Sequence, residues 1–450
     1  MSEGDGDDVD LLDPFRQFLS FESDVLVLSL AMFAFSLGFQ MTSRYIPEYM
    51  AALGASAFVI GLFGTVGNVI GAAYPYPGGR LSDRIGSRVA LTLFGLLSTL
   101  GFAVWLVAPH LGTIEVAGVV FEPWIWIFVG LFLAQAWKSF GLGATFAVVK
   151  QSVPPHRLAR GFASTEVFRR TAFLIGPLIA AGVLYAVADF TVGFQYVLAI
   201  GLLVGAVATA AQHLLYDASE DSLGKEFEGV SEVVDDLRSL PSELRPLLVA
   251  DTLVRFANGM VYVFFVIVIT QFLAVSLDVG PVTLEPAVLF GVLLAIEMLV
   301  ALVSMPPAAR IAERVGLKPV VALGFLVYAV FPVLLISVPP GTALTAPLVI
   351  LLFAFSGLRF AGLPAHKALI VGPAERDTGG RVSGSYYLVR NTIVIPSAAI
   401  GGLIYGGFTV PGTDIGYAGD PVVAFGLASA IGTVGVAYFL LYGEEYDAYA

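Results

Sequence analysis

Residues 79–88 read Gly79-Arg80-Leu81-Ser82-Asp83-Arg84-Ile85-Gly86-Ser87-Arg88, a short charged segment between two long apolar runs. Its two glycines allow the backbone to turn sharply and let the flanking elements approach each other. A related segment, Arg310–Lys318, follows 230 residues later with its acid, bases and glycine in the same register. The matched pairs are Arg80 and Arg310, Asp83 and Glu313, Arg84 and Arg314, Gly86 and Gly316, and Arg88 and Lys318. The chain therefore contains an internal repeat.

The composition is that of an integral membrane protein. Hydrophobic residues make up 57% of the chain and charged residues 13%, and the mean hydropathy is +0.86. A soluble domain carries about 25% charged residues. Apolar runs long enough to cross a hydrocarbon core of about 30 Å recur along the chain, and lipid offers their backbone groups no partners, so we expect helices. We predict an all-α membrane fold with twelve transmembrane helices, at residues 22–50, 55–78, 88–109, 122–149, 161–187, 192–216, 244–275, 285–306, 318–338, 345–371, 381–407 and 420–442.

The distribution of Lys and Arg predicts the orientation in the membrane. These residues occupy the loops after the second, fourth, eighth and tenth predicted helices, whereas the alternate loops carry acids but no Lys or Arg. The positive-inside rule places both termini in the cytoplasm of a multi-pass plasma-membrane protein. The expected units are a cytoplasmic tail (1–21), a six-helix bundle (22–216), an acidic cytoplasmic linker (217–243), a second six-helix bundle (244–442) and a short cytoplasmic tail (443–450).

The charge and the scarcity of metal-binding side chains limit the partners. The net charge is -12, which argues against nucleic acid as a partner and fits the acidic surface of a protein from a halophile. The chain has no cysteine and only four scattered histidines, so we expect neither disulfides nor a metal site. We expect no cofactor. The expected partners are the lipid bilayer, a small-molecule substrate and a coupling proton, with the chain acting as a monomer.

Further matches stand 221 residues apart. Lys138-Ser-Phe-Gly141-Leu-Gly143 corresponds to Arg359-Phe-Ala-Gly362-Leu-Pro364, and Arg169 corresponds to Arg390. Together with the charged turns, these motifs resemble the major facilitator superfamily of transporters, from the first predicted helix to the last. The resemblance implies two pseudo-symmetric bundles that rock about a central site. It also implies a cytoplasmic gate formed by Gly79, Asp83, Arg84, Gly86, Arg88, Glu313, Arg314 and Gly316.

One motif bears on the direction of transport. Gly176-Pro177 resembles part of the motif of proton-driven antiporters, which implies a drug/proton antiporter type. Ala180-Ala181 stands where that motif usually has a glycine pair.

Ionisable residues inside predicted helices mark candidate functional positions, because each costs about 3 kcal/mol or more in a membrane. Three pairs have the four-residue spacing of helical ion pairs: Arg44–Glu48, Glu166–Arg170 and Asp251–Arg255. Other charges lack an obvious local partner, and His366 and Lys367 lie near a predicted cytoplasmic helix end, where they can reach the interface. The candidate substrate-binding or coupling residues are Arg44, Glu48, Lys138, Glu166, Arg169, Glu297, Arg359 and Arg390.

Two interpretations of these charges remain open. Bases outnumber acids, so an anionic substrate would relieve the excess. Alternatively, Lys138 and Arg359 hold Glu297 or Glu166 in a pair that a proton breaks, with Glu297 as the proton carrier. The leading prediction is proton-coupled export of a small organic compound by alternating access. The alternatives are an importer or exporter of small anions, a facilitator without a coupling ion, and a non-transporting sensor derived from a transporter. The chain carries no enzyme or nucleotide-binding motif, so we do not expect an enzyme.

Overall fold

The computed structural model describes residues 23–74, 81, 84–116, 118–138, 158–216, 241–371, 379–409 and 416–445. These residues are almost entirely helical, as the composition predicts. Within them, eight helical segments are long and apolar enough to cross a membrane, and four further apolar helices are shorter, with 10–17 residues. The chain is therefore an all-helical, multi-pass membrane protein.

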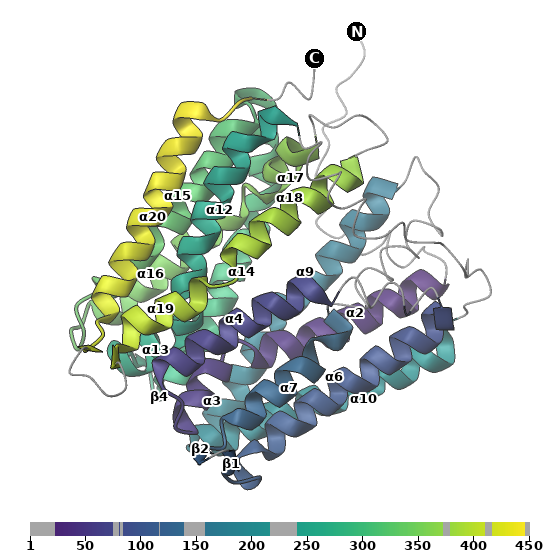
Figure 1. Cartoon of the computed structure of the whole chain (residues 1–450), viewed down its shortest axis with the longest axis vertical. Coiled ribbons are helices and arrows are strands. Elements are labelled where there is room, and N and C mark those ends of the chain that lie inside the picture. The colour runs from purple at the N-terminus through teal and green to yellow at the C-terminus, as the bar shows by residue number, and fades with distance from the viewer. Residues whose placement is uncertain are drawn as a thin grey trace.

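The helices form two groups that follow the order of the chain (Figure 1). The helices of the first group are α2 (Ser23–Thr42), α3 (Ile46–Ala52), α4 (Ala57–Ala73), α6 (Ser87–Val107), η1 (Ala108–His110), α7 (Ile125–Ala136), α9 (Leu158–Ala186) and α10 (Phe190–Leu215). Those of the second are η4 (Ser242–Leu244), α12 (Arg245–Val261), η5 (Tyr262–Phe264), α13 (Phe265–Ile267), η6 (Val268–Phe272), α14 (Pro286–Val315), α15 (Leu317–Ile336), α16 (Thr345–Gly357), η7 (Leu358–Phe360), α17 (Leu363–Val371), α18 (Gly379–Val394), α19 (Ser397–Gly406) and α20 (Pro421–Tyr442).

Three short antiparallel hairpins occupy connections that the sequence analysis treats as plain loops. Gly118 and Gly280 have φ values of 79° and 61°, the left-handed backbone that tight hairpin turns require. Figure 1 shows β1, β2 and β4 at the same end of the molecule. The strands are β1 (Ile114–Val116) with β2 (Val119–Phe121), β3 (Leu277–Val279) with β4 (Val282–Leu284), and β5 (Phe408–Thr409) with β6 (Gly416–Tyr417).

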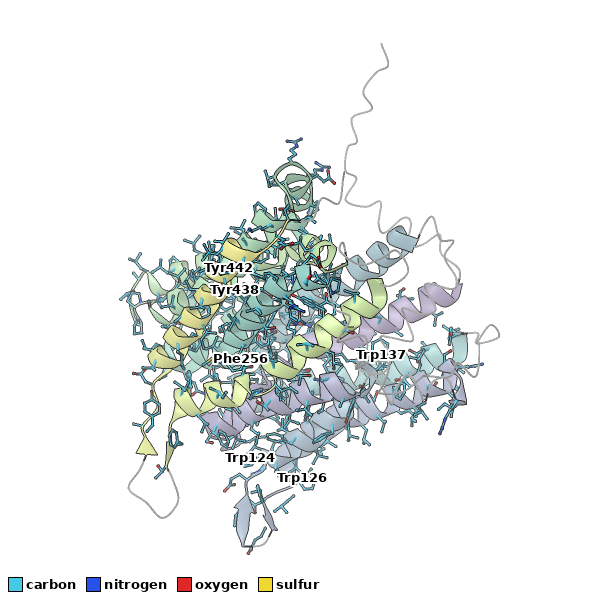
Figure 2. All side chains as sticks on the ribbon, turned by 45° about the horizontal axis from the view of Figure 1, so that its top comes forward. Trp124, Trp126, Trp137, Phe256, Tyr438 and Tyr442 are labelled. Carbon is cyan, nitrogen blue, oxygen red and sulfur yellow. The ribbon has the colours of Figure 1, made fainter. Side chains whose placement is uncertain are left out.

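Aromatic side chains lie toward both ends of the helices. Figure 2 shows Trp124 and Trp126 beside the β1–β2 hairpin, and Tyr438 and Tyr442 farther from the hairpin end, on α20. The rings of Tyr438 and Tyr442 lie 4.9 Å apart. Trp and Tyr are enriched at both membrane–water interfaces, so this arrangement fits helices that cross a bilayer with the hairpins at one surface.

The two groups meet closely near the hairpin end. In α4, a side chain at Gly61 would clash with the carbonyl oxygen of Ala398 in α19. In α14, a Cβ at Gly291 would lie 2.6 Å from the carbonyl oxygen of Pro177 in α9. Tyr45 is fully buried at this junction and donates a hydrogen bond of 3.0 Å to the carbonyl of Ala287. The helices of the two groups are therefore in direct contact at this end.

One predicted boundary is wrong. The helix expected at residues 285–306 continues to Val315, so Arg310, Glu313 and Arg314 lie in its last turns and not in a loop. Arg and Glu are good helix formers, and Gly316 is the first residue whose backbone, with φ of 94°, leaves the helix. Gly86 has φ of 84° at the matching position before α6. The repeated turns therefore share their glycine geometry.

Several predicted helices are interrupted where they carry a cation. A turn at residues 43–45 separates α2 from α3, and Thr42 donates a hydrogen bond of 2.9 Å back to the carbonyl of Gly38, which bends a helix. Lys138 lies in a short π-helical stretch, and its counterpart Arg359 lies in the 3₁₀ helix η7. Such irregular turns inside helices often mark functional sites.

Candidate functional site

A cavity of about 500 Å³ lies between the two groups of helices. Its wall comes from α2, the turn before α3, α4, α6, α7, α12, α14, α15, α18 and the short helices η5 and η7. Amide and aromatic side chains line part of it, among them Asn258, Asn391 and Tyr262. Five bases line it as well, and no acid does among the residues that the structure describes there. These bases are Arg44, Lys138, Arg255, Arg359 and Arg390.

A buried carboxylate stands behind one part of this wall. Glu297 of α14 is 3% exposed and forms a buried ion pair with Arg359 of η7. Ser356 donates a hydrogen bond of 3.0 Å to the same carboxylate oxygen. Nη2 of Arg44, from the first group of helices, lies 4.0 Å from the other oxygen. The sequence shows no local partner for Arg359 or Glu297 because folding pairs residues 62 positions apart, as one of the two open interpretations proposes.

Arg359 keeps unused hydrogen-bonding capacity. Its guanidinium carbon lies 4.8 Å from the ring centre of Phe360 and 5.1 Å from that of Tyr328, both within cation–π range. Its Nε and Nη1 are buried and have no acceptor in the described part of the chain. A buried donor without a partner costs about 1–3 kcal/mol. Arg359 also lines the cavity.

A second buried carboxylate, Asp251 of α12, lies within 3.3 Å of four other side chains. Nε of Arg255 lies 3.2 Å from Oδ1, which confirms the helical pair expected from their spacing. Nη1 of Arg390 donates to Oδ2 at 3.0 Å, a long-range partner that the sequence does not show locally. The hydroxyl of Tyr386 donates to Oδ2 at 3.2 Å, and Nε2 of His366 lies 3.3 Å from the same oxygen. His366 is 4% exposed and therefore does not reach the membrane surface as expected.

Tyr328 of α15 connects the two clusters. Its hydroxyl accepts a hydrogen bond of 3.0 Å from Arg255, and the face of its ring lies against Arg359. The connected clusters contain four guanidinium groups and two carboxylates, so they carry surplus positive charge even when His366 is neutral. The cavity wall is therefore electropositive.

The predicted pair between Arg44 and Glu48 is not formed. Arg44 lies against the ring of Tyr262, with 4.0 Å between guanidinium carbon and ring centre. Glu48 instead accepts hydrogen bonds from Thr270 at 2.7 Å and Gln271 at 3.1 Å, across the junction of the two groups. The turn at residues 43–45 breaks the helical register, so the four-residue spacing no longer places both side chains on one face. Glu48 belongs to the closed hairpin end and not to the cavity wall.

Lys138 lines the cavity and is exposed there, and its Nζ lies 5.8 Å from the ring centre of Phe39. The side chains of Glu166 and Arg169 lie outside the described residues. Gly79 and Asp83 of the predicted gate also lie outside them. Within the described ranges, no three His, Asp or Glu side chains gather as ligands for a metal ion.

The described gate residues contact their own half of the chain. Nε of Arg88 donates 2.7 Å to the carbonyl of His213 at the end of α10. Nζ of Lys318 donates 2.7 Å to the carbonyl of Gly443 after α20, again 230 residues later. Glu445 accepts hydrogen bonds from the backbone N–H groups of Leu317 and Lys318 and thereby caps α15. Arg84, Glu313 and Arg314 are exposed.

Several residues at the site were not among the sequence candidates. Asp251, His366, Tyr328 and Tyr386 come from four different helices and meet only in the folded chain. The four-residue spacing of Asp251 and Arg255 was visible, but it suggested a local pair. No sequence pattern connects His366 with Asp251, which lie 115 residues apart.

Comparison with known proteins places this geometry in a family. The model of the Major Facilitator Superfamily matches residues 28–277, which is more than half of the chain. Uncharacterized MFS-type transporters from two strains of Mycobacterium tuberculosis are 28% identical over 183 residues. That alignment covers 39% of this chain and 38% of each relative, so it spans well under half the length of either protein.

Solved structures share the fold over nearly the whole chain. A mutant of the nucleoside transporter NupG superposes with a TM-score of 0.70 at 11% identity, covering 94% of this chain and 99% of that one. A POT family transporter in complex with 5-aminolevulinic acid gives 0.67 at 15% identity, covering 94% and 98%. A peptide transporter POT in complex with sulfate gives 0.66 at 15% identity, covering 96% and 97%.

The family match, the MFS-type transporters among the relatives and the shared fold all assign the chain to this superfamily. The repeated glycine turns and the cavity between two groups of helices agree with that assignment. The chain belongs to the Major Facilitator Superfamily.

Proposed function

We propose that this protein is a secondary transporter of small organic anions, coupled to protons. The observation that carries the proposal is the cavity wall, where five bases stand and no acid does among the described lining residues. A guanidinium group binds carboxylate or phosphate through two parallel hydrogen bonds. Arg359 lines this wall, and its Nε and Nη1 have no acceptor among the described residues.

The buried pair of Glu297 and Arg359 is the proposed point of proton coupling. A proton on Glu297 would remove its charge and release Arg359 toward the cavity. An anion that binds Arg359 would in turn weaken the hold of Arg359 on Glu297 and favour protonation. Because such coupling is reciprocal, proton and anion would favour each other's binding. They would then cross the membrane together, and the inward proton gradient would drive import.

Export of a small organic compound in exchange for protons is the second candidate. Gly176-Pro177, which resembles part of the antiporter motif, favours this exporter. The positive charge of the cavity does not favour it. Exchange requires that proton and substrate compete for the site, whereas cotransport requires that they bind together. The two candidates therefore predict opposite pH dependence of substrate binding.

The proposed mechanism is alternating access by two six-helix bundles with twelve spans, residues 22–216 and 244–442, joined by the linker 217–243. The described helices occupy part of every predicted span, which supports this division. We further propose a plasma-membrane protein with cytoplasmic termini, acting as a monomer, and a halophilic source for its acidic surface. The hairpin end, where the bundles touch at Gly61 and Gly291, would then be the closed outer side.

A thermal-shift panel on the purified protein tests the substrate class. Phosphate, lactate, succinate and citrate would be compared with the cationic amphipath tetraphenylphosphonium, at pH 5.5 and pH 8. A ligand that binds only the folded state raises the unfolding midpoint. Lys138→Gln and Arg44→Gln remove lining charges without breaking the ion pair of Glu297 with Arg359.

We expect stabilisation by at least one anion, stronger at pH 5.5, and weaker stabilisation in both variants. Stabilisation by the amphipath alone, unchanged in both variants and stronger at pH 8, would favour the exporter instead.

A further inference from the structure

Four carboxamide side chains line the cavity in addition to its bases. All four are half-buried, and none of their side chains forms a hydrogen bond with any group in the described part of the chain. Their nitrogen and oxygen atoms are not closed off from solvent either. These four open amides are Gln40 of α2, Asn68 of α4, Gln135 of α7 and Asn258 of α12.

Other amides of the chain are engaged by the protein. Oδ1 of Asn391, which also lines the cavity, accepts hydrogen bonds of 3.1 and 2.9 Å from Arg390 and so positions a base. Outside the cavity, Gln195 donates to a backbone carbonyl at 3.0 Å, and Gln271 donates to Glu48 at 3.1 Å. The open amides are therefore distinguished by their place on the cavity wall, where a bound molecule is the partner within reach.

Two of the open amides stand one helical turn from a base. Asn258 follows Arg255 by three residues in α12, and Gln135 precedes Lys138 by three residues at the end of α7, so each amide lies near a base on its helix. Three residues of helix rise about 4.5 Å. Because α7 starts at the hairpin end and α12 runs toward it, both amides lie closer to that end than their bases (Figure 1).

Bases and amides suit different parts of a ligand. Guanidinium and ammonium groups only donate hydrogen bonds, whereas a carboxamide donates through its nitrogen and accepts through its oxygen. No acid lines the cavity among the described residues, so the open amides are prominent acceptors for a ligand O–H group. A hydroxyl group also both donates and accepts. Two neighbouring hydroxyls on a carbon chain therefore match the two ends of one carboxamide.

We propose that the anion bound in this cavity is polyhydroxylated, a sugar acid in chemical class. Its carboxylate lies against the bases, and its hydroxyl groups exchange hydrogen bonds with the four open amides. Rings that line the same cavity, among them Phe63, Tyr262 and Phe290, offer apolar surface to the C–H groups of the carbon skeleton. The volume of about 500 Å³ is within the range of about 300–1,000 Å³ that is usual for small-molecule sites.

This inference rests on the proposed function, because it assumes that an organic anion binds here, and it adds which anion. A carboxylic acid without hydroxyl groups would satisfy the bases but would cover the open amides with hydrocarbon. Water would then leave these amides without a replacement partner, which weakens binding. A site that hydrogen-bonds the hydroxyl groups of its ligand rejects analogues that lack them.

The experiment is a calorimetric titration of the purified full chain in lipid nanodiscs at pH 5.5, with titrations into empty nanodiscs subtracted. Gluconate is compared with hexanoate, which has the same carbon chain and carboxylate but no hydroxyl groups. Glucuronate is compared with cyclohexanecarboxylate in the same way. We expect at least one hydroxylated acid to bind about tenfold or more tightly than its analogue.

Substitutions in the wall separate the two kinds of contact. Asn68→Leu and Asn258→Leu keep a similar shape but remove the amide, so they should weaken binding of the hydroxylated acid by about tenfold and leave its analogue unweakened. Lys138→Gln should weaken both ligands. Gln195→Met, outside the cavity, is the matched amide control and should change neither affinity. Retained binding of the analogue shows that each variant is folded.

The outcomes distinguish this inference from the proposed function. If each hydroxylated acid binds no more tightly than its analogue, the inference is wrong, whereas an anion site remains. If the amide variants weaken both members of a pair equally, the amides act through the fold and not on the hydroxyl groups, which also overturns the inference. If none of the four acids binds, the proposed anion site fails, and the inference fails with it.

Discussion

The two halves of the chain share a scaffold but differ in where they bury charge. Arg359 in the second half is 3% exposed and pairs with Glu297, whereas its counterpart Lys138 in the first half is exposed to the cavity. At the offset of 230, the residue matching Glu297 is Gly67, which lines the cavity and has nothing within 4 Å of its would-be Cβ. At the offset of 221, the residue matching Asp251 is Leu30. Among the side chains that the structure describes, both buried carboxylates of the site therefore belong to the second half.

The repeat is better preserved in the backbone than in the charges. Gly86 and Gly316 have nearly the same φ, and Arg88 and Lys318 bind equivalent carbonyls at the same distance. Lys138 of the first half is exposed to the cavity, while the second half holds guanidinium groups on buried acids. We propose that proton chemistry belongs to the second half and that the first half supplies the opposing wall of the substrate site.

The largest effect should come from breaking the buried ion pair. Arg359→Gln leaves Glu297 with only the distant Arg44 as a counter-charge, and an uncompensated buried charge costs about 3–5 kcal/mol. Thermal unfolding in detergent should show a large loss of stability. Lys138→Gln, the matched change in the first half, should leave the midpoint nearly unchanged. The double variant Glu297→Gln with Arg359→Gln should recover most of the loss; equal losses at Lys138 and Arg359 would contradict the asymmetry.

The next effect concerns the contact between the halves at the hairpin end. A methyl group at Gly61 would clash with the carbonyl of Ala398, and overpacking of this kind costs about 1–3 kcal/mol. Gly61→Ala should force α4 and α19 apart. Because the chain has no cysteine, Ala287→Cys, half-buried at the junction beside Tyr45, gives a reporter of opening through its labelling rate.

The matched control for that change is Gly71→Ala on the same helix, where nothing lies within 4 Å of the added group. Labelling should accelerate several-fold in Gly61→Ala and stay unchanged in Gly71→Ala. Identical labelling in both variants would mean that the close packing at Gly61 does not hold this end shut.

A smaller effect is expected at Glu48, whose carboxylate joins the halves through Thr270 and Gln271. Glu48→Gln keeps the shape but exchanges charge-assisted hydrogen bonds for neutral ones, a difference of about 1 kcal/mol. Opening at the hairpin end, followed through the same half-buried Ala287→Cys reporter, should become a few-fold more frequent, and anion binding should persist. If anion binding were lost while the labelling rate stayed unchanged, Glu48 would instead have the substrate-binding role predicted from the sequence.

The smallest effects should be equal in the two halves. Arg88→Met and Lys318→Met each remove one hydrogen bond to the carbonyl end of a helix, worth about 0.5–1 kcal/mol. Both should lower the unfolding midpoint slightly and by similar amounts. A large effect of Arg88→Met alone on transport rate, with stability intact, would support the gate role implied by the family over the anchoring role.

The sequence predicted the helical membrane fold, the family and the repeat, because these depend on hydrophobic runs and on turn residues that are visible locally. Three features depended on tertiary structure and were missed. The hairpins form in short connections rich in Val, Ile and Leu, α14 continues through a charged segment, and the turn at residues 43–45 separates Arg44 from Glu48.

The site was only partly predictable for the same reason. Lys138, Glu297, Arg359 and Arg390 could be selected because a charge inside an apolar run is costly. Their partners could not be selected, since each pair joins different helices. One of the two open interpretations already paired Arg359 with Glu297. The cluster around Asp251 became visible only when α12, α17 and α18 were packed together.

Proton movement in proteoliposomes tests the central claim most directly. Protein reconstituted with a trapped pH-sensitive dye would receive an inward gradient of phosphate, lactate, succinate or citrate in turn, with voltage clamped by potassium and valinomycin. Cotransport predicts acidification of the lumen with at least one anion, and its loss in Glu297→Gln although labelled anion still exchanges. Alkalinisation driven by tetraphenylphosphonium entry, with no response to any anion, would contradict an anion site coupled to protons.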